Sequence, residues 1–455
     1  MEKWEYIKWP VYIIIIAGHV IAIVFITRQS PEQLVSAAGL LIFVFLTYVF
    51  SKHPRQIKWR PVIWGLVLQF LLGLFVLRTD IGLTIFDWLG DIVTIFLGFA
   101  NVGAEFVFGE NYLDHYFAFS VLPVVIYFSS VISVLYYLGV MQVIISKVAW
   151  LMQNTMKTSA SESLNAAGNI FVGMTEAPLL IRPFIKEMTL SELHAIMTGG
   201  FATIAGSVLG AYISFGIDAT HLISASVMSA PAALAMAKLF WPETEESKTA
   251  NADQVDIPKG EERNMIEAAS FGAATAVSLV ANIAANLIAF LAILACCNAI
   301  LTWFGGLVGI EDPPLTFELI CSYVFMPVAF IMGVEWNDCR LVAELIGIKT
   351  FINEFVAYER LGEIIEAGTI SKRSEVIATY ALCGFANISS IGIQLGGLTP
   401  MAPERKSDLA QVAIRALIAG TTACFMTACI AGILYEVDEV TSPTTNMMTD
   451  MMTIT

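Results

Sequence analysis

Charged side chains are scarce in this chain: only 14% of its 455 residues are Asp, Glu, Lys or Arg, whereas 57% are hydrophobic. Soluble domains carry about 25% charged residues, so the composition excludes an ordinary soluble domain and indicates a polytopic membrane protein. The net charge of −15 argues against nucleic acid as a partner. Much of the negative charge lies in the 243–262 loop and in the tail after Tyr435, both expected to be solvated.

Cysteine and histidine are also sparse, and neither follows the spacing of a ligand set. The five histidines form no cluster, and the seven cysteines lie mostly inside apolar segments. The cysteines show neither metal spacing nor a disulfide framework, so we expect them to be small residues of the membrane core. No fingerprint of a nucleotide or other cofactor occurs either.

Three apolar runs near the start of the chain approach the length that crosses a bilayer, about 17–25 residues. They cover residues 11–26, 34–50 and 62–77. The excess of basic residues before the first run and between the second and third predicts a cytoplasmic N-terminus and a cytoplasmic 51–60 loop. These basic residues are Lys3, Lys8, Lys52, Arg55, Lys58 and Arg60. Neither a removable signal peptide nor regulation through a long hydrophilic N-terminal tail is expected.

Two glutamates, Glu176 and Glu354, lie among polar residues deep in otherwise apolar sequence. Each is followed about thirty residues later by an apolar helix that small and hydroxyl residues interrupt, at 203–210 and at 383–392. A carboxylate at membrane depth costs roughly 2.5–3.5 kcal/mol or more and is usually retained for function. Two such units in equivalent places are typical of a secondary transporter built from repeats.

We therefore predict an all-α polytopic membrane protein, with scaffold helices and a transport domain of two inverted repeats. Each repeat would consist of a re-entrant hairpin, a broken helix and a further helix, because non-helical backbone survives at membrane depth only inside protein or beside water. In chain order we expect N-terminal spans, an interfacial helix and a scaffold helix (1–140), the first repeat (141–240), an acidic loop (241–262), a long scaffold helix (263–312), the second repeat (313–435) and a polar tail (436–455).

Two finer boundaries follow from local patterns. The apolar segment 81–101 is interrupted by aspartates, which favours a helix lying along the interface over one that crosses. The second hairpin is expected to turn near 347–353, which places Glu354 at its tip, and the helix 376–398 is expected to break around residues 387–390.

The polar residues of the two repeats suit a neutral solute that carries several hydroxyl groups. Glu176 with Thr175, and Glu354 facing Asn387 and Ser390, would supply acceptors and donors from both repeats. A dicarboxylate or phosphate fits poorly, because no basic residue is directly beside either glutamate, and Arg182 lies six positions after Glu176. Phe385 offers a flat face for a ring, although ordinary helix packing would also explain an aromatic residue here. The two glutamates could likewise be buried carboxyl groups with a purely structural role.

Several of these motifs resemble the concentrative nucleoside transporter family, animal branch, over nearly the whole chain from Trp59. The most specific are Gly-Met-Thr-Glu-Ala-Pro at 173–178 and Asn-Glu-Phe-Val-Ala-Tyr at 353–358. Further matching stretches are 59–70, 107–110, 119–123, 136–139, 199–216 and 383–400.

The resemblance implies a sodium-coupled nucleoside symporter of the plasma membrane that assembles as a homotrimer. By motif position, the nucleobase would contact Met174, Thr175, Glu176 and Val208. The ribose would contact Glu354, Asn387 and Ser390, with Phe385 beside the ligand. The coupling ion, Na+, would bind to Asn169, the carbonyl of Val172, Thr203 and the carbonyl of Ile204.

Substrate selectivity depends in this resemblance on Gly173, Met174, Ser207 and Val208. Many members have Gln at the position of Met174, and Gly-Met here looks like the purine-preferring animal subtype. Ser207-Val208 is instead similar to the broad-specificity form. We expect purine nucleosides and uridine to be carried.

Three alternatives remain open at the level of sequence. The first is a broad-specificity nucleoside symporter that also uses protons. The second is an intramembrane enzyme with Glu176 and Glu354 as an acid and base pair, and the third is a channel. Repeats with hairpin tips favour alternating access over an open pore.

Overall fold

The computed structural model describes residues 18, 22–23, 31–112, 118–119, 122–249 and 262–436, and all its regular elements are helices. Within these residues, seven helical segments are long and apolar enough to cross a membrane, or eight if the bent pair α6 and α7 counts as one span. The all-α polytopic class is therefore confirmed. The predicted run 11–26, residues 250–261 and the tail after residue 436 lie almost wholly outside the described residues.

The helices of the first half are α2 (Pro31–Val49), η1 (Pro54–Gln56), α3 (Trp59–Arg78), α4 (Asp80–Gly98), α5 (Ala100–Phe108), α6 (Leu122–Tyr137), α7 (Val140–Met156), α8 (Ala160–Gly168), η4 (Ala177–Glu187), α9 (Leu190–Ala202), α10 (Gly206–Ser214) and α11 (Ala219–Phe240). Those of the second half are α12 (Met265–Leu307), α13 (Phe317–Val324), α14 (Met326–Met332), α15 (Cys339–Phe351), α16 (Glu354–Glu366), α17 (Lys372–Leu382), α18 (Ile388–Leu398), η6 (Pro403–Arg405) and α19 (Lys406–Leu434).

The segment expected to lie along the interface forms α4, which begins one residue after α3 ends. Thr79 separates the two helices and caps α4 by accepting a hydrogen bond from the Gly82 amide at 3.0 Å. Together α4 and α5 make an apolar segment of 29 residues, a length and composition that also suit a crossing helix. The interfacial placement of this segment stays a prediction.

The first hairpin starts from a capping box. The Ser159 hydroxyl accepts a hydrogen bond from the amide of Glu162, and the Glu162 carboxylate accepts one from the amide of Ser159. Two backbone N–H groups at the start of α8 thus gain partners. After Gly168 the chain runs without an α-helix to the 3-10 helix η4. The same kind of box, formed by Thr189 and Glu192, starts α9.

Both following helices are broken, the first between Ala202 and Gly206. The second break covers residues 383–387, a few positions before the predicted 387–390, which is a correction. Gly384 has a φ of +150°, and a Cβ there would lie 2.7 Å from Cys424 Sγ, so the chain turns at this glycine. Asn387 caps α18 instead, because its Oδ1 accepts the amide of Ser390 at 2.8 Å.

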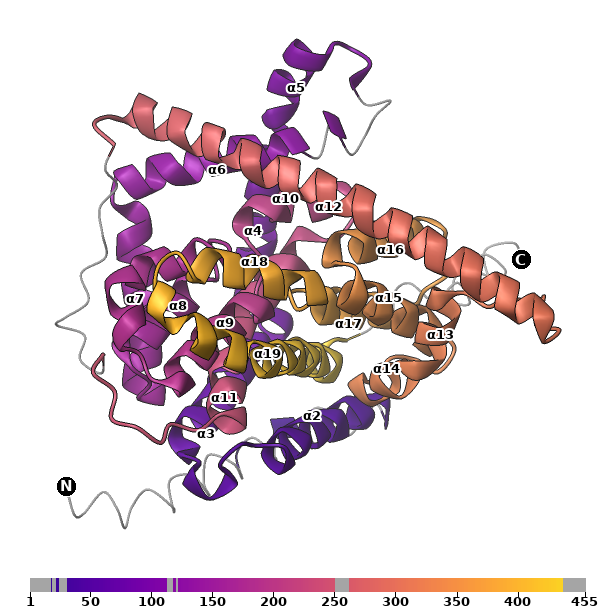
Figure 1. Cartoon of the computed structure of the whole chain (residues 1–455), viewed down its shortest axis with the longest axis horizontal. Helices are drawn as coiled ribbons and strands as arrows, with labels where there is room; N and C mark the ends of the chain where they lie inside the picture. The colour runs from indigo at the N-terminus through magenta and orange to yellow at the C-terminus, as the bar shows by residue number, and fades with distance from the viewer. Residues whose placement is uncertain are drawn as a thin grey trace, which may run out of the picture.

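The same succession of hairpin, broken helix and long helix occurs twice, ending in α11 and in α19, which pack against each other. The 43-residue helix α12 connects the two halves and runs diagonally across the other helices (Figure 1). It packs along α6, where Gly272 permits a close approach: a Cβ there would lie 2.6 Å from the Ser129 carbonyl oxygen.

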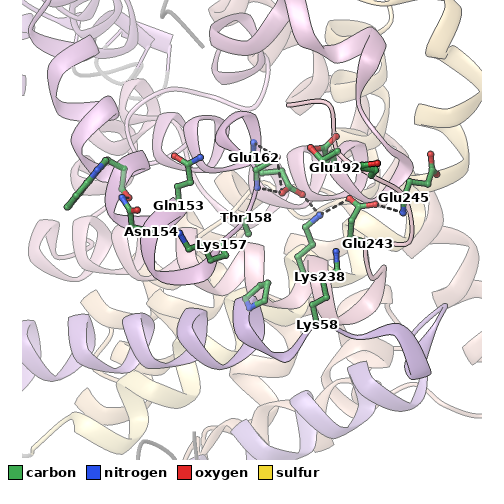
Figure 2. A pocket seen from close by; sticks show the side chains of 15 residues that line it. Lys58, Gln153, Asn154, Lys157, Thr158, Glu162, Glu192, Lys238, Glu243 and Glu245 are labelled. Carbon is green, nitrogen blue, oxygen red and sulfur yellow. Dashed lines mark hydrogen bonds and ion pairs between the residues drawn. The ribbon is translucent and has the colours of Figure 1, made fainter. Parts of the chain in front are cut away.

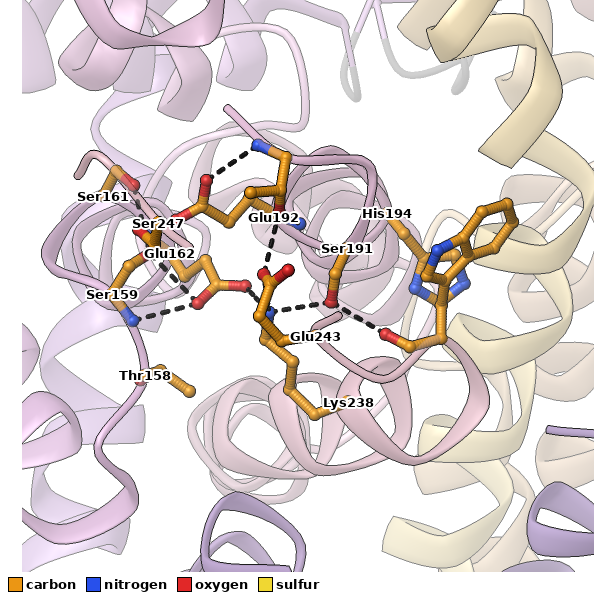
Figure 3. A network of polar contacts seen from close by, with 12 residues as sticks. Thr158, Ser159, Ser161, Glu162, Ser191, Glu192, His194, Lys238, Glu243 and Ser247 are labelled. Carbon is orange, nitrogen blue, oxygen red and sulfur yellow. Dashed lines mark hydrogen bonds and ion pairs between the residues drawn. The ribbon is translucent and has the colours of Figure 1, made fainter. Parts of the chain in front are cut away.

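The start of the acidic loop is only partly the solvated linker that its charge predicts, because Glu245, Glu246 and Lys248 are exposed whereas the residues around them are held. Ser247 and Thr249 both donate hydrogen bonds to Glu192 Oε1, at 2.5 and 2.8 Å, and Thr249 is only 1% exposed. Thr189 donates to Glu243 at 2.8 Å. Figures 2 and 3 show Glu162, Glu192 and Glu243 near Lys238, which pairs with Glu162 and donates to Ser191. These contacts hold the segment in place: the Glu243 carboxylate offsets the charge of Lys238, and the hydroxyl groups of Ser247 and Thr249 satisfy Glu192.

Candidate functional site

A cavity lies where the two hairpin tips and the two helix breaks meet. All eight predicted substrate contacts lie in its wall: Met174, Thr175, Glu176, Val208, Glu354, Phe385, Asn387 and Ser390. The two glutamates, 178 positions apart in sequence, thus face one shared space. The structure brings these residues together as the sequence predicts, and their contact with a solute stays a prediction.

Glu354 is the most firmly held group of this cavity. It is the first residue of α16, which Asn353 caps by accepting the amide of Val356 at 3.0 Å. Its Oε1 accepts the Tyr212 hydroxyl at 3.3 Å, and its Oε2 accepts the Asn387 amide at 2.9 Å. With only 3% of the residue exposed, the carboxylate is oriented by groups from α10 and from the second break.

The amide of Asn387 can point only one way. Its Oδ1 accepts two hydrogen bonds, from the Ser390 amide at 2.8 Å and from the Ser389 hydroxyl at 2.7 Å. The NH2 group is therefore directed at Glu354, because a reversed amide would set donors against donors. One residue thus both caps α18 and orients the glutamate.

Glu176 is held locally at the tip of the first hairpin. Its Oε2 accepts the amide of Gly173 at 2.9 Å. The same glutamate also lines a neighbouring cavity, together with Val172 and Ser207. Ser207 Oγ is buried and has no hydrogen-bond partner among the described residues, so it is available to a ligand.

The four residues predicted to hold sodium lie around the first break. Asn169 is fully buried, and neither its Oδ1 nor its Nδ2 has a hydrogen-bond partner in the described part of the chain. Thr203 ends α9, and its hydroxyl donates to the Gly199 carbonyl at 2.9 Å. Val172 and Ile204 are buried beside them. The unpaired amide oxygen of Asn169 and the free lone pairs of the Thr203 hydroxyl, next to unwound backbone, fit a hard cation such as sodium.

Sequence reasoning missed one hydrogen-bond partner of Glu354 and one helix of the cavity wall. The first is Tyr212, which lies four residues after Val208 and so on the same face of α10, a spacing that could have identified it. The second is α12, which contributes Leu279, Ile283 and Asn286. Nothing in the even hydrophobicity of α12 marks these positions.

Comparison with known proteins identifies the family of the whole chain. Residues 38–111 match the description "Na+ dependent nucleoside transporter N-terminus", residues 118–219 match "Nucleoside recognition", and residues 221–432 match "Na+ dependent nucleoside transporter C-terminus". The chain is 58% identical to rat solute carrier family 28 member 3 over 96% of its length, and 59% identical to mouse sodium/nucleoside cotransporter 1 over 90%. It spans 63% and 65% of the lengths of these two relatives.

A solved structure agrees with the fold. CNTnw in an inward-facing, substrate-bound state superposes with a TM-score of 0.83 at 38% identity, covering 89% of this chain and 98% of that one. A variant of CNTnw in an outward-facing state gives the same TM-score. The match thus extends over both repeats and the helices around them, and the chain belongs to the concentrative nucleoside transporter family, a family of transporters and not of enzymes.

Proposed function

We propose that this protein moves nucleosides together with sodium ions across a membrane by alternating access. The observation that carries the proposal is the shared cavity, in which Glu354, oriented by Asn387, faces Glu176 of the other repeat. The buried Glu354 and the half-buried Glu176 accept hydrogen bonds from neutral donors of the protein, which suits recognition of hydroxyls and amines better than acid and base chemistry. The inward- and outward-facing states of CNTnw support alternating access.

The two ends of the cavity suit the two halves of a nucleoside. Glu354, Asn387 and Ser390 present an ionised acceptor beside an amide and a hydroxyl, which suits the vicinal hydroxyls of ribose. Met174, Thr175, Glu176 and Val208 combine apolar surface with a carboxylate, which suits a base with ring N–H or amino groups. Phe385 lines the same cavity.

Sodium would be held by Asn169, the Val172 carbonyl, Thr203 and the Ile204 carbonyl. Since Asn169 belongs to the first hairpin, bound sodium would order the hairpin tip that carries Glu176. Sodium would then raise nucleoside affinity, and linkage requires nucleoside to raise sodium affinity by the same factor. An inward-negative potential adds about 2.3 kcal/mol per 100 mV for each charge carried, which suffices to accumulate a neutral solute.

The proposal is tested by uptake into cells or proteoliposomes. Labelled inosine and uridine are expected to accumulate above the outside concentration when sodium is outside, and not when choline replaces it. Equilibration without accumulation would identify a channel. Absence of any nucleoside flux, with the protein folded and inserted, would reject nucleoside transport altogether.

Selectivity is proposed to favour purine nucleosides and uridine, with Met174 as the main cause. Met174→Gln adds an amide at the base edge, and one added hydrogen bond is worth about 1 kcal/mol, or roughly fivefold to tenfold. The ratio of kcat/KM for cytidine to that for inosine is expected to rise by about this factor. The measurement is uptake of both labelled nucleosides at saturating sodium.

The control for Met174→Gln is the sodium dependence of inosine uptake, which should stay unchanged because Met174 is outside the proposed sodium ligands. Cytidine or thymidine outcompeting inosine in the unmodified protein would contradict purine selectivity. Coupling to protons as well as sodium, assembly as a homotrimer, the plasma membrane location and a cytoplasmic N-terminus are further proposals that rest on the family resemblance and the basic loop at 51–60.

A further inference from the structure

A lysine is completely buried next to the cavity, and the transport scheme above gives it no role. Lys349 lies in the last turn of α15, in the second hairpin, and only 1% of it is exposed. Its ammonium group donates a hydrogen bond to the Ala381 carbonyl oxygen at 2.8 Å. Burying an ammonium group costs free energy unless it is well paired. An apolar residue would fill this position at lower cost, so we expect the lysine to serve a function.

Lys349 occupies in the second repeat the place that Asn169 occupies in the first. Asn169 precedes Glu176 by seven residues, and Lys349 precedes Glu354 by five. Asn169 lies against the last turn of α9, where a Cβ on Gly199 would be 3.1 Å from its Nδ2. Lys349 bonds to the last turn of α17. Each residue thus reaches from its hairpin to the end of the helix before the break.

The two breaks differ in how their polar groups are satisfied. At the first break the Asn169 amide is left without a hydrogen-bond partner among the described residues. The carbonyls at the end of α9 are bonded by neutral donors, the Thr203 hydroxyl at Gly199 and Cys424 Sγ at Ala202. At the end of α17 the Tyr358 hydroxyl bonds Thr379 at 2.8 Å and Cys424 Sγ bonds Cys383 at 3.0 Å, but the donor to Ala381 is the ammonium of Lys349. The C-terminal end of a helix carries partial negative charge and favours a cation.

We propose that the ammonium of Lys349 is a built-in cation that supplies to the second break the positive charge that sodium supplies to the first. This inference rests on the proposed sodium site. Sodium would then bind and leave at one repeat only, while the other repeat keeps a permanent charge. Lys349 is a positioning residue: it holds the end of α17, from which the break leads to Asn387.

The proposal is tested with two replacements of the same lysine. Lys349→Met keeps the volume and removes the charge, whereas Lys349→Ala also leaves a space for a small amine. Both are expected to raise the KM for inosine at least about tenfold, the effect of losing one charge-assisted hydrogen bond. Adding ethylammonium should lower the KM again in Lys349→Ala and have no effect in Lys349→Met, where the space is filled.

The matched control is Lys372→Met at the start of α17, where the lysine is exposed and pairs with Glu375. This variant should keep the KM of the unmodified protein. A normal KM in Lys349→Met, or no recovery of Lys349→Ala with ethylammonium, would overturn the proposal. Sodium-driven uptake by the unmodified protein is measured in parallel, so that its absence would count against the proposed function and not against Lys349 alone.

If neither variant reaches the membrane surface, the detergent-extracted proteins decide the question. Ethylammonium should then raise the melting temperature of Lys349→Ala and leave those of Lys349→Met and the unmodified protein unchanged. Equal melting temperatures of Lys349→Ala with and without ethylammonium would reject a cation site at the second break.

Discussion

Glu354→Gln is expected to lower kcat/KM for nucleoside uptake by about 10- to 100-fold. Both oxygens of Glu354 accept hydrogen bonds, from Tyr212 and from Asn387. A glutamine can accept at only one of these positions; with its oxygen at the Asn387 amide, its NH2 group has to donate to the Tyr212 oxygen, which reverses that hydrogen bond. The ribose hydroxyls would also lose an ionised acceptor, and hydrogen bonds to charged groups are worth about 1.5–3 kcal/mol. The measurement is the initial rate of inosine uptake at saturating sodium.

The control for this variant is Glu359→Gln, which changes an exposed carboxylate on the same helix. It should transport like the unmodified protein. Both variants should elute at the same oligomeric size, because Glu354 lies inside the cavity and not on the outer surface. Uptake by Glu354→Gln within twofold of the unmodified rate would remove the ribose role from this residue.

Asn169→Leu is expected to abolish the stabilisation of the protein by sodium and to raise its stability when sodium is absent. An unsatisfied buried amide costs about 1–3 kcal/mol, and an apolar side chain of the same shape avoids this cost. Bound sodium normally stabilises by about 2.7 kcal/mol at a hundredfold excess over its Kd, and this increment would disappear with the ligand. Melting temperatures in sodium and in choline buffer measure both effects, and uptake by the variant should no longer respond to sodium.

Asn165→Leu is the matched control, one helical turn earlier on the same hairpin. The Asn165 Nδ2 donates to the Ile196 carbonyl at 3.4 Å, and Asn165 is not among the proposed sodium ligands, so its replacement should leave the sodium-induced shift intact. A sodium-induced shift that survives in Asn169→Leu would place the ion elsewhere. A sodium-induced shift that is lost in Asn169→Leu and kept in Asn165→Leu is difficult to attribute to general damage.

The sequence predicted the parts of this structure that depend on strong local signals. Lone glutamates in apolar sequence identified both hairpin tips, because few other features explain a carboxylate at that depth. The second break was placed a few residues late, since Asn387 and Ser390 were taken as interrupting a helix that they in fact cap. The 3-10 conformation of η4 and the 29-residue length of α4 with α5 arise from packing that no local pattern specifies.

The candidate site was predicted residue by residue only where a motif carried it. Tyr212 was missed although its position on α10 follows from Val208, and Lys349 was missed because a lysine reads from sequence as a surface residue. The held start of the acidic loop was missed for the same reason, since charge predicts solvation unless a buried partner such as Lys238 is known. Long-range pairs of this kind are visible only in three dimensions.

The wall that α12 contributes to the cavity has a consequence for movement. Leu279 and Ile283 are apolar, so their contacts are van der Waals contacts. Such contacts are not directional, and sliding along them breaks no hydrogen bond. If the repeats shift past this helix, the side chains of Leu279 and Ile283 oppose the movement little. The Asn286 amide, in contrast, can hydrogen-bond to the solute or to the repeats at one stage of the movement. The nucleoside would then move with the two repeats and lose its contact with α12 during each crossing.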